Sequence, residues 1–422
     1  MAGLLRDHDF RRLFEGDLAS QLSTQILMMA MPLVAVVALD APEFQVGVLT
    51  ALSTAAFLVV GLPAGAWVDR MRRRNVLIVS DIGRAIALAS IPIAWWIDAL
   101  TIWQLYVVAA GVGVMTVFFD VAYQSYLPFL VGRDNVVEAN ARLEAIRATT
   151  QLGGPTAAGW LVQWATAPFA IIGNVAGFAI SAWRIARIRG REARPQLRPG
   201  ARLRTEIAEG LRFVVSNRLL RSIALCTGSF NLCMSAFTAM EMVFFARVLE
   251  LSPGAIGMFF SIGAVGGLLG ALVTDRLARR VGQGPLIWMS VAFTSPFMLA
   301  APLAEPGFRF WLAAAAWTVV SFGTVTYNVS QVSFRQRLTP DPLLGRMNAT
   351  MRFLVWGTMP LGGLIGGALG QTLGARSTLL IAAGGACLAF LPIYFSPLRK
   401  MQELPGAHLI ATERKRPNTH SQ

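Results

Sequence analysis

Apolar stretches of roughly 20 residues recur along most of this chain, and each is long enough for a helix to cross about 30 Å of hydrocarbon. Glycine and proline occur inside these stretches, which membrane helices tolerate. A transmembrane β-barrel has short segments of alternating hydrophobicity instead, and the sequence lacks that pattern. We therefore predict an all-α membrane protein with twelve spans, at about residues 14–39, 45–68, 75–97, 102–130, 138–165, 168–188, 219–246, 254–274, 285–303, 309–334, 347–372 and 375–396.

The composition agrees with a surface that faces lipid. Of the 422 residues 55% are apolar and only 14% are charged, a balance that a water-soluble protein of this size could hardly keep in solution. The net charge of +14 is compatible with nucleic-acid binding, but the position of the charges favours membrane topology instead. Of the 37 Lys and Arg residues, 34 lie on one face, against Arg247, Arg309 and Arg376 on the other.

The basic face is predicted to be cytoplasmic, so both termini lie inside a bacterial-type inner membrane. Residues 1–12 are charged and run into the first span without a small-residue cleavage site, which indicates a retained helix rather than a removed signal peptide. Four parts follow from the span pattern: an N-terminal six-helix bundle at 1–188, a cytoplasmic linker at 189–218, a C-terminal six-helix bundle at 219–397 and a disordered cytoplasmic tail at 398–422.

The linker contains one amphipathic segment. Four apolar residues recur at helical spacing opposite four charged ones, which predicts an interfacial helix on the anionic inner leaflet. The apolar residues are Ile207, Leu211, Val214 and Val215, and the charged ones are Arg204, Glu206, Glu209 and Arg212.

The chain repeats a short basic pattern. Asp69-Arg70 and three arginines at 72–74 follow the second span, and Asp275-Arg276 with arginines at 279 and 280 follows the eighth, 206 residues later. A second pair of related segments, at residues 134–155 and 341–363, has an offset of 207 to 208. Two nearly equal offsets indicate two duplicated halves of six spans each.

The loops after the second and eighth spans resemble motif A of the major facilitator superfamily. Further segments resemble the branch of that superfamily that contains the enterobactin exporter and the macrolide or tetracycline efflux proteins. These segments are Phe10-Arg11-Arg12-Leu13, Gly65 to Arg74, Asp81-x-x-Arg84, Asp120, Pro128, Ala139-Asn140 and Pro340-Asp341-x-x-x-Gly345-Arg346-x-Asn348. The resemblance covers essentially the whole chain and implies alternating access of a central cavity between two six-helix bundles.

Two positions depart from the family pattern. Members of the branch often carry an acidic residue after a Ser-Gln-Leu-Gly turn in the first helix, whereas Thr24 follows Ser20-Gln21-Leu22-Ser23 here. A proton carrier at that position is therefore not expected. Arg72 lies where motif A usually has glycine, so the first loop should be bulkier and more basic.

Motif A implies a set of gating residues. A carboxylate next to a helix N-terminus gains about 0.3–1 kcal/mol from the exposed N–H groups. Asp69 facing the start of span eleven, and Asp275 facing the start of span five, are expected to latch the halves on the cytoplasmic side. Asp120 should lie toward the cytoplasm, with Arg73 as its preferred partner. The gating residues are Gly65, Asp69, Arg70, Arg73, Asp120, Asp275 and Arg276, and the alternative is that the arginines serve only topology.

An ionisable group inside the membrane is expensive and functional by default. We consider Asp17, Asp120 and Glu241. Asp17 is close enough to Arg12 to reach the interface instead, and Asp120 fits a gate. Glu241 has no obvious cationic neighbour, so it suits proton exchange or a cationic substrate, unless its side chain reaches the outer surface.

Helix-bending residues mark spans five and eleven. Gly153-Gly154-Pro155 with Gly159 resembles part of the antiporter signature, and Pro360-Leu361-Gly362-Gly363 is its counterpart. Small residues let helices approach closely, and proline bends a span. Both a hinge and an antiporter-specific seal remain open for Gly154, Pro155, Gly159, Pro360 and Gly362.

The best-supported function is a secondary active transporter, a proton-coupled exporter of a small amphipathic molecule such as a drug or a siderophore. Import of a small metabolite is the alternative. A membrane-embedded enzyme is disfavoured because His8, His408 and His420 are all terminal, and no lysine forms a nucleotide-binding loop. The three cysteines lack metal-ligand spacing. We expect a monomer in the bilayer, with no metal, cofactor or nucleic acid.

Overall fold

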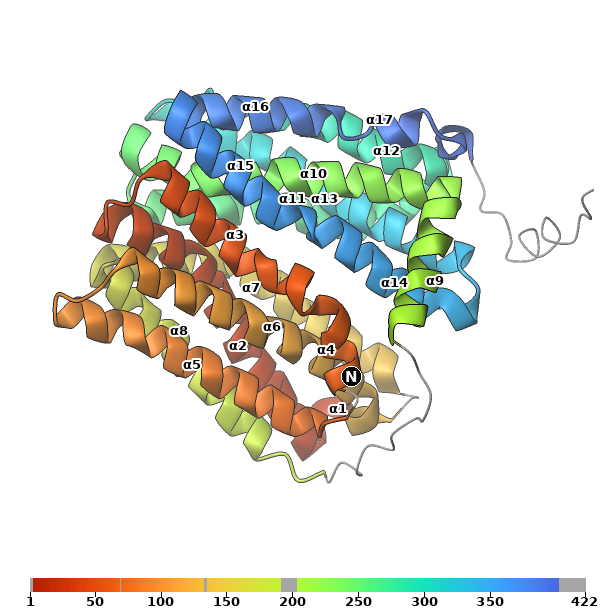
Figure 1. Cartoon of the computed structure of the whole chain (residues 1–422), viewed down its shortest axis with the longest axis horizontal. Coiled ribbons are helices and arrows are strands. Elements are labelled where there is room, and N and C mark those ends of the chain that lie inside the picture. The colour runs from red at the N-terminus through yellow and green to blue at the C-terminus, as the bar shows by residue number, and fades with distance from the viewer. Residues whose placement is uncertain (1–2, 69, 133–134, 191–202, 402–422) are drawn as a thin grey trace, which may run out of the picture.

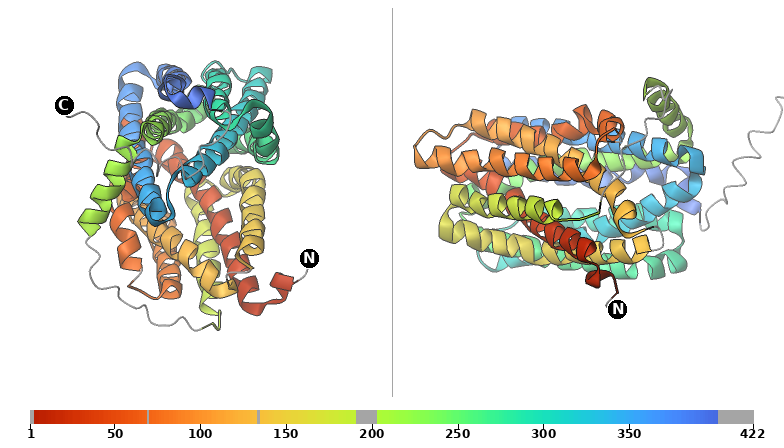
Figure 2. Two further views of the ribbon diagram at one scale, coloured as in Figure 1. Left: turned by 90° about the vertical axis from the view of Figure 1, so that its right-hand side faces the viewer. Right: turned by 90° about the horizontal axis from the view of Figure 1, so that it is seen from below.

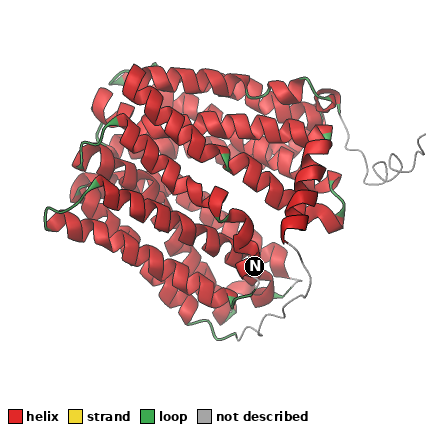
Figure 3. Cartoon of the chain, in the orientation of Figure 1, coloured by secondary structure: helices red, strands yellow, loops and turns green. Residues whose placement is uncertain are grey.

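The structure is a computed structural model that describes residues 3–68, 70–132, 135–190 and 203–401. Every regular element in these ranges is helical (Figure 3). Asp69, Asp134 and the predicted tail after residue 401 lie outside the described residues, so the expectations for them stay predictions.

The first six predicted spans are all present. A short α1 (Gly3–Arg6) precedes the first span, which is α2 (His8–Leu33) continued by the π-helical turn η1 (Val34–Ala38). The second span is divided into α3 (Glu43–Val59) and α4 (Gly61–Val68). The next four are α5 (Arg73–Trp96), α6 (Ile102–Val131), α7 (Val136–Ala165) and α8 (Ala167–Ala186).

The second half begins after the linker helix α9 (Leu203–Ser216). Its first span is α10 (Arg218–Val243) with the π-helical turn η3 (Phe244–Val248). The next three are α11 (Pro253–Val281), α12 (Gln283–Thr294) with the 3₁₀ turn η4 (Ser295–Ala300), and α13 (Phe308–Leu338). The last two are α14 (Asp341–Trp356) with α15 (Thr358–Leu373), and α16 (Ala375–Leu388) with α17 (Leu391–Tyr394), before the short turn η5 (Pro397–Lys400).

The first span of each half is built in the same way. Asp7 caps α2 by accepting hydrogen bonds from Asp9 N and Phe10 N at 2.9 Å. Asn217 caps α10 in the same way by accepting hydrogen bonds from Leu219 N and Leu220 N. Such caps satisfy N–H groups that have no partner inside the helix. Both helices end in a π-helical turn, followed by a residue with positive φ, Asp40 at 45° and Glu250 at 50°. The duplication read from the sequence therefore extends to local geometry.

Nine of the described helices are long and apolar enough to cross a membrane by length and composition. The remaining three predicted spans fall short for separate reasons. α3 has 17 residues and is separated from α4 at Val60, α7 carries four charged side chains in its first half, and α12 passes into η4 at Ser295-Pro296. All three still lie among the other helices in the bundles (Figure 1).

The second copy of the basic motif is helical, which corrects the expectation of a loop. α11 continues through Asp275, Arg276 and both later arginines to Val281, and Gly282 ends it with a φ of 93°. The segment contains no proline or glycine before Gly282, so nothing in it stops the helix. The first copy differs, because α4 ends at Val68 and α5 begins only at Arg73.

The helices form two bundles that lie side by side. α2 to α8 form one and α10 to α17 the other, as the two colour groups of Figures 1 and 2 show. The bundles meet mainly where α3 packs on α15 and α7 packs on α11. The predicted fold class, two six-helix bundles in an all-α membrane protein, is confirmed, whereas the domain limits at residues 188 and 219 stay predictions.

The linker helix α9 packs against α14 of the second half (Figure 1). Val214 is fully buried, Gly210 lies against the backbone of Arg346, and Glu209 forms an ion pair with Arg346. Leu211 and Val215 are exposed. The predicted helix is therefore present, with one side on the protein and two apolar residues turned outward.

Candidate functional site

A buried ion pair lies inside the first half. Asp81 and Arg84 are three residues apart on α5, so both project from the same face, and their side chains form a salt bridge. Asp81 is 0% exposed and Arg84 is 2% exposed. The Arg84 guanidinium lies 4.5 Å from the centre of the Phe119 ring and 4.3 Å from that of Phe178. Aromatic faces on α6 and α8 thus supply cation–π attraction that helps offset the cost of burying this charge.

The sequence analysis used Asp81-x-x-Arg84 only to identify the family resemblance and did not predict the pair as part of the candidate site. A signal was available, since two opposite charges at a spacing of three residues occur in the middle of an apolar span. Charges inside a membrane helix that pair with each other in this way mark functional or structural centres. The rings on either side of Arg84 come from segments 35 and 94 residues away, and no local pattern predicts them.

Asp17 on α2 is 3% exposed and does not reach the interface. Its polar neighbours are Gln21 and Tyr123, and it interacts electrostatically with Arg147 of α7. Arg12, the partner considered from sequence, lies 4.0 Å from Asp9 instead. Asp17 therefore belongs to the interior of the first bundle.

Asp120 on α6 is half-buried and connects the two halves electrostatically. The cations that act on its carboxylate are Arg84, Arg352 of α14 and Arg147. Arg352 belongs to the second half, and its guanidinium lies over the Trp356 ring at 4.5 Å. The charged cluster, which we define as Asp17, Asp81, Arg84, Asp120 and Arg147, thus extends to the seam between the bundles.

Arg73, which we expected as the partner of Asp120, is not among these cations. The reason is depth in the membrane. Asp120 lies eleven residues before the end of α6, and Arg84 lies eleven residues after the start of α5, so both are about 16 Å from that end of the bundle. Arg73 is the first residue of α5, too far from Asp120 along the helix axis.

The other residues implied by motif A lie at the ends of their helices. Gly65 is in α4 with open space at its Cα, and Arg70 lies exposed in the turn that follows. Asp275 and Arg276 are exposed on α11, and Asp275 forms no ion pair with any described residue. The latch of Asp69 falls outside the described residues, and the latching roles stay predictions.

Glu241 is buried in the second half. It lies in the last turn of α10, is 2% exposed, and its Oε1 has no hydrogen-bond partner among the described residues. No charged group of the described chain acts on it. The alternative of a side chain that reaches the outer surface does not fit this burial. An unpaired carboxylate here would be costly, so the neutral form is favoured unless a cation approaches.

The proline and glycine residues of spans five and eleven lie at packed seams. Gly159 of α7 meets the Pro253 carbonyl of α11, and Gly257 of α11 meets the Pro155 carbonyl of α7. A Cβ at either glycine would collide with the opposing backbone. α7 continues through Pro155 without a break, whereas span eleven divides at Gly357, three residues before Pro360. Gly154 lies against Gln25, and Gly362 lies against the Leu232 carbonyl of α10.

Polar contacts join the halves along the same seam. Thr156 Oγ1 and Ser261 Oγ are 2.8 Å apart, and Gly254 N donates to Gln163 Oε1 at 3.1 Å. On the other side of the interface Gly47 of α3 lies against Gly363 and Gly367 of α15. These close approaches all occur toward the ends where α3 and α11 begin.

Arg247 closes that end of the interface, and sequence reasoning gave it no role. From η3 of the second half it donates to Val36 O and Ala41 O of the first half, each at 2.9 Å, and it lies 2.8 Å from Asp40 Oδ1. Its other nitrogen is 3.8 Å from Glu43 Oε1. Four acceptors from one bundle thus surround one guanidinium of the other.

No three His, Cys, Asp or Glu side chains converge as a metal site requires in the part of the chain that the structure describes. The carboxylates and arginines of the charged cluster can move charge or bind a charged group by ion pairing. Carboxylates that alternate between a proton and an arginine partner are the chemistry that it offers.

Comparisons with known proteins identify a family of membrane transporters. The family model described as Major Facilitator Superfamily matches residues 16–360. The chain is 26% identical over 373 residues to the "Multidrug efflux pump Tap" of Mycolicibacterium fortuitum, covering 82% of this chain and 86% of that protein. It is 26% identical over 403 residues to the "Enterobactin exporter EntS" of Escherichia coli O1:K1 / APEC, covering 92% and 91%.

The fold is shared with a solved bacterial homologue of the iron transporter ferroportin. Its inward-facing structure has a TM-score of 0.73 at 17% identity and covers 93% of this chain and 98% of that one. The outward-facing structure of such a homologue has a TM-score of 0.58, also at 17% identity, and covers 91% and 98%.

Proposed function

This chain belongs to the major facilitator superfamily and is a multi-pass membrane transporter rather than an enzyme, and we propose that it exports small amphipathic molecules by proton-coupled alternating access. Both named relatives with high coverage are efflux proteins, one for drugs and one for a siderophore. Their shared direction supports export over import for this chain. The substrate is proposed only as a class, a drug or a siderophore of amphipathic character.

The observation that carries proton coupling is the charged cluster of the first half. Asp17 and Asp120 both interact electrostatically with Arg147, and Asp120 also interacts with Arg352 across the interface. A proton taken up by Asp120 removes its attraction to Arg352, because only the carboxylate is anionic. Protonation of one side chain would therefore weaken a tie between the bundles and favour their relative movement.

The contacts between the bundles support an inward-open state for this conformation. Arg247 and the glycine seams join the halves at one end, and Asp275 of the proposed inner latch is exposed and unpaired with any described residue. The greater likeness to an inward-facing homologue than to an outward-facing one points the same way. In the outward-open state Asp69 and Asp275 are proposed to latch the opposite end.

We further propose that both termini are cytoplasmic, that residues 1–188 and 219–397 form the two moving units, and that the protein acts as a monomer in the lipid bilayer. The uneven distribution of arginine supports the orientation. A tag placed after residue 422 should resist labelling from outside intact cells. Labelling of that tag without permeabilisation would overturn the orientation.

Transport by purified protein in proteoliposomes tests the function. We expect a pH gradient to drive uphill accumulation of ethidium, a cationic amphipathic dye, and a protonophore to abolish it. Asp120→Asn should lose gradient-driven transport but retain downhill movement, because the neutral amide resembles the protonated acid. Gln124→Ala, an exposed position one turn along α6, serves as the control. Full uphill transport by Asp120→Asn would remove this residue from coupling, and Asp17→Asn in the same assay then ranks the alternative.

A further inference from the structure

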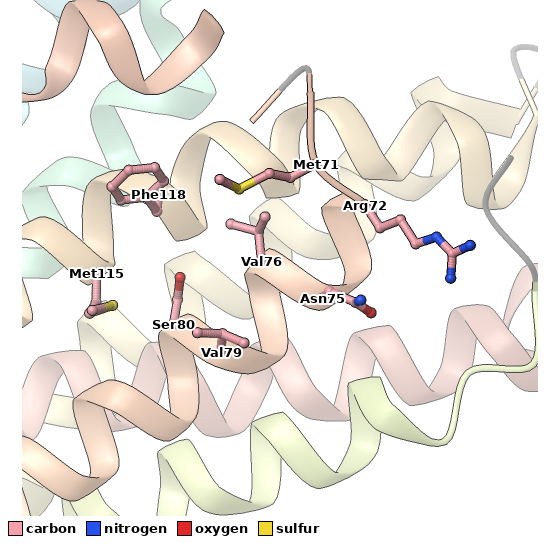
Figure 4. Close-up of a pocket in the computed structure, with 8 residues that line it drawn as sticks. All are labelled: Met71, Arg72, Asn75, Val76, Val79, Ser80, Met115 and Phe118. Atoms are coloured by element: carbon pink, nitrogen blue, oxygen red, sulfur yellow. The ribbon is translucent and has the colours of Figure 1, made fainter. Parts of the chain in front are cut away.

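A cavity of about 470 Å³ lies on the first half where the turn after α4 meets α5 and α6. Its lining is mostly apolar, with Met71, Val76, Val79, Met115 and Phe118, and it has three polar members, Arg72, Asn75 and Ser80. Figure 4 shows Met115 and Phe118 at one end and Arg72 and Asn75 at the other. The cavity is separate from the charged cluster, whose residues do not line it. We call it the α4–α6 groove.

The apolar end of the groove is continuous with a surface that faces lipid. Val79 is 61% exposed, and Ile82 and Ile86 follow it on the same side of α5 at 45% and 68% exposure. In a membrane transporter such a stripe contacts acyl chains. A lipid tail lying along this stripe can therefore enter the groove without crossing any polar surface.

The polar end carries a cation that has no partner among the described residues. Arg72 is exposed and forms no ion pair or hydrogen bond with any described residue. Its neighbour Arg74, in contrast, donates to the backbone carbonyls of Ile185 and Ala186 at the end of α8. Arg72 also precedes the first turn of α5, and no side chain caps that turn. Guanidinium groups bind phosphate well, and the positive end of a helix adds to that attraction.

We propose that the α4–α6 groove binds one anionic phospholipid, with the headgroup phosphate on Arg72 and Asn75 and an acyl chain along Val79, Met115 and Phe118. The volume of the groove is in the range of small-molecule sites. Its cation lies at one end and its apolar lining at the other, which matches the anionic headgroup and the acyl chains of a phospholipid. Motif A usually has glycine at this position, which offers no side chain to a phosphate. The arginine thus makes the site a property of this chain rather than of the motif.

Native mass spectrometry of the delipidated, full-length protein tests the proposal. Phosphatidylglycerol and phosphatidylcholine with identical acyl chains are titrated, and the Kd for the first bound lipid is measured. We expect phosphatidylglycerol to bind more tightly, and Arg72→Ala to weaken it about fivefold, the effect of one basic residue near an anionic lipid. Binding of phosphatidylcholine should not change. Val79→Trp should weaken both lipids, because the indole fills the groove from an exposed position.

Matched variants separate this site from general effects of charge and bulk. Arg279→Ala removes an exposed arginine from the second basic motif, and Ile86→Trp adds bulk to the same stripe of α5 outside the groove. Both should leave the Kd for phosphatidylglycerol unchanged. The proposal is overturned if Arg72→Ala binds phosphatidylglycerol as the native protein does, if Arg279→Ala loses as much affinity, or if glycerol phosphate alone displaces the lipid, which would indicate a site for free phosphate.

Discussion

The first half pairs the buried Asp81 with Arg84 and buries Asp17 in the field of Arg147, whereas the second half buries Glu241 and Arg335 without a partner of opposite charge among the described residues. The interior of the second half also contains packed aromatic rings. The ring centres of Phe245 and Phe259 are 4.9 Å apart, those of Phe259 and Phe310 are 5.5 Å apart, and those of Phe237 and Trp317 are also 5.5 Å apart. Two halves with the same helix order therefore differ in what their interiors can do.

The difference indicates a division of labour. Paired charges can exchange partners when one carboxylate takes up a proton. Aromatic side chains carry no charge that a proton could alter, and they stabilise the interior through close packing. α11 and α13 of the second half pack so closely that Gly266 meets the Thr318 carbonyl. We infer that the paired charges, which can exchange partners, lie in the first half, whereas in the second half the isolated carboxylate of Glu241 is the group that can take up a proton within a more rigid surrounding.

The largest expected effect is on stability, from breaking the buried pair. Arg84→Ala leaves the Asp81 carboxylate uncompensated between apolar helices, and the loss should be about 3–5 kcal/mol. Thermal unfolding of the purified protein in detergent measures it. Asp81→Asn combined with Arg84→Gln removes both charges and should recover much of the loss. If the single and double variants unfold at the same temperature, the pair does not organise the first half.

Glu241→Gln tests whether the second half takes part in proton coupling as well as the first. Because Glu241 is the one acidic residue placed well inside the second half's predicted spans, we expect this variant to lose uphill, gradient-driven export while it still binds substrate, with weaker binding only for cationic substrates. The amide mimics a permanently protonated acid, so export is no longer coupled to the proton gradient, whereas the substrate still binds. Proteoliposome transport and equilibrium binding measure the two properties. Undiminished gradient-driven export would confine coupling to the first half.

A smaller effect is expected at the end where Arg247 joins the halves. Arg247→Ala removes charged hydrogen bonds to Val36 O and Ala41 O, and the balance of states should shift about tenfold toward outward-open. Spin-label distances between α3 and α15 report the shift. Arg309→Ala is a matched control, since Arg309 in the first turn of α13 pairs with Glu305, four residues earlier in the same half, and not with the other half. Equal distance distributions for both variants would show that Arg247 does not hold the seam.

The smallest effect is expected from the first basic motif. Asp69→Asn and Arg73→Ala should lower transport several-fold and reduce the outward-open population, because each is proposed to remove a contact between states rather than a core contact, which for the Asp69 carboxylate at a helix N-terminus is about 0.3–1 kcal/mol. Folding and membrane insertion should stay largely intact. Asp275→Asn probes the same role on α11, which is helical at this position. Normal export rates for Asp69→Asn and Arg73→Ala would assign these residues to topology alone.

The amino-acid sequence by itself predicted the twelve spans, the duplication and the family, because hydrophobic length and repeat offset are local properties of the chain. It also placed Asp17, Asp120 and Glu241 inside the spans, since their depth follows from counting residues along a helix. It did not predict that Arg73 is absent from the cations around Asp120, nor that α11 runs on to Val281.

Only the tertiary structure decided which side each residue of a helix faces and what lies opposite. The rotation of α5 about its axis puts Arg84 between Phe119 and Phe178 rather than in lipid. The meeting of η1 and η3 brings Arg247 to Val36, 211 residues away. Charges within a span indicate that one side avoids lipid, but they do not indicate which distant helices cover that side, so packing against those helices determines the contacts.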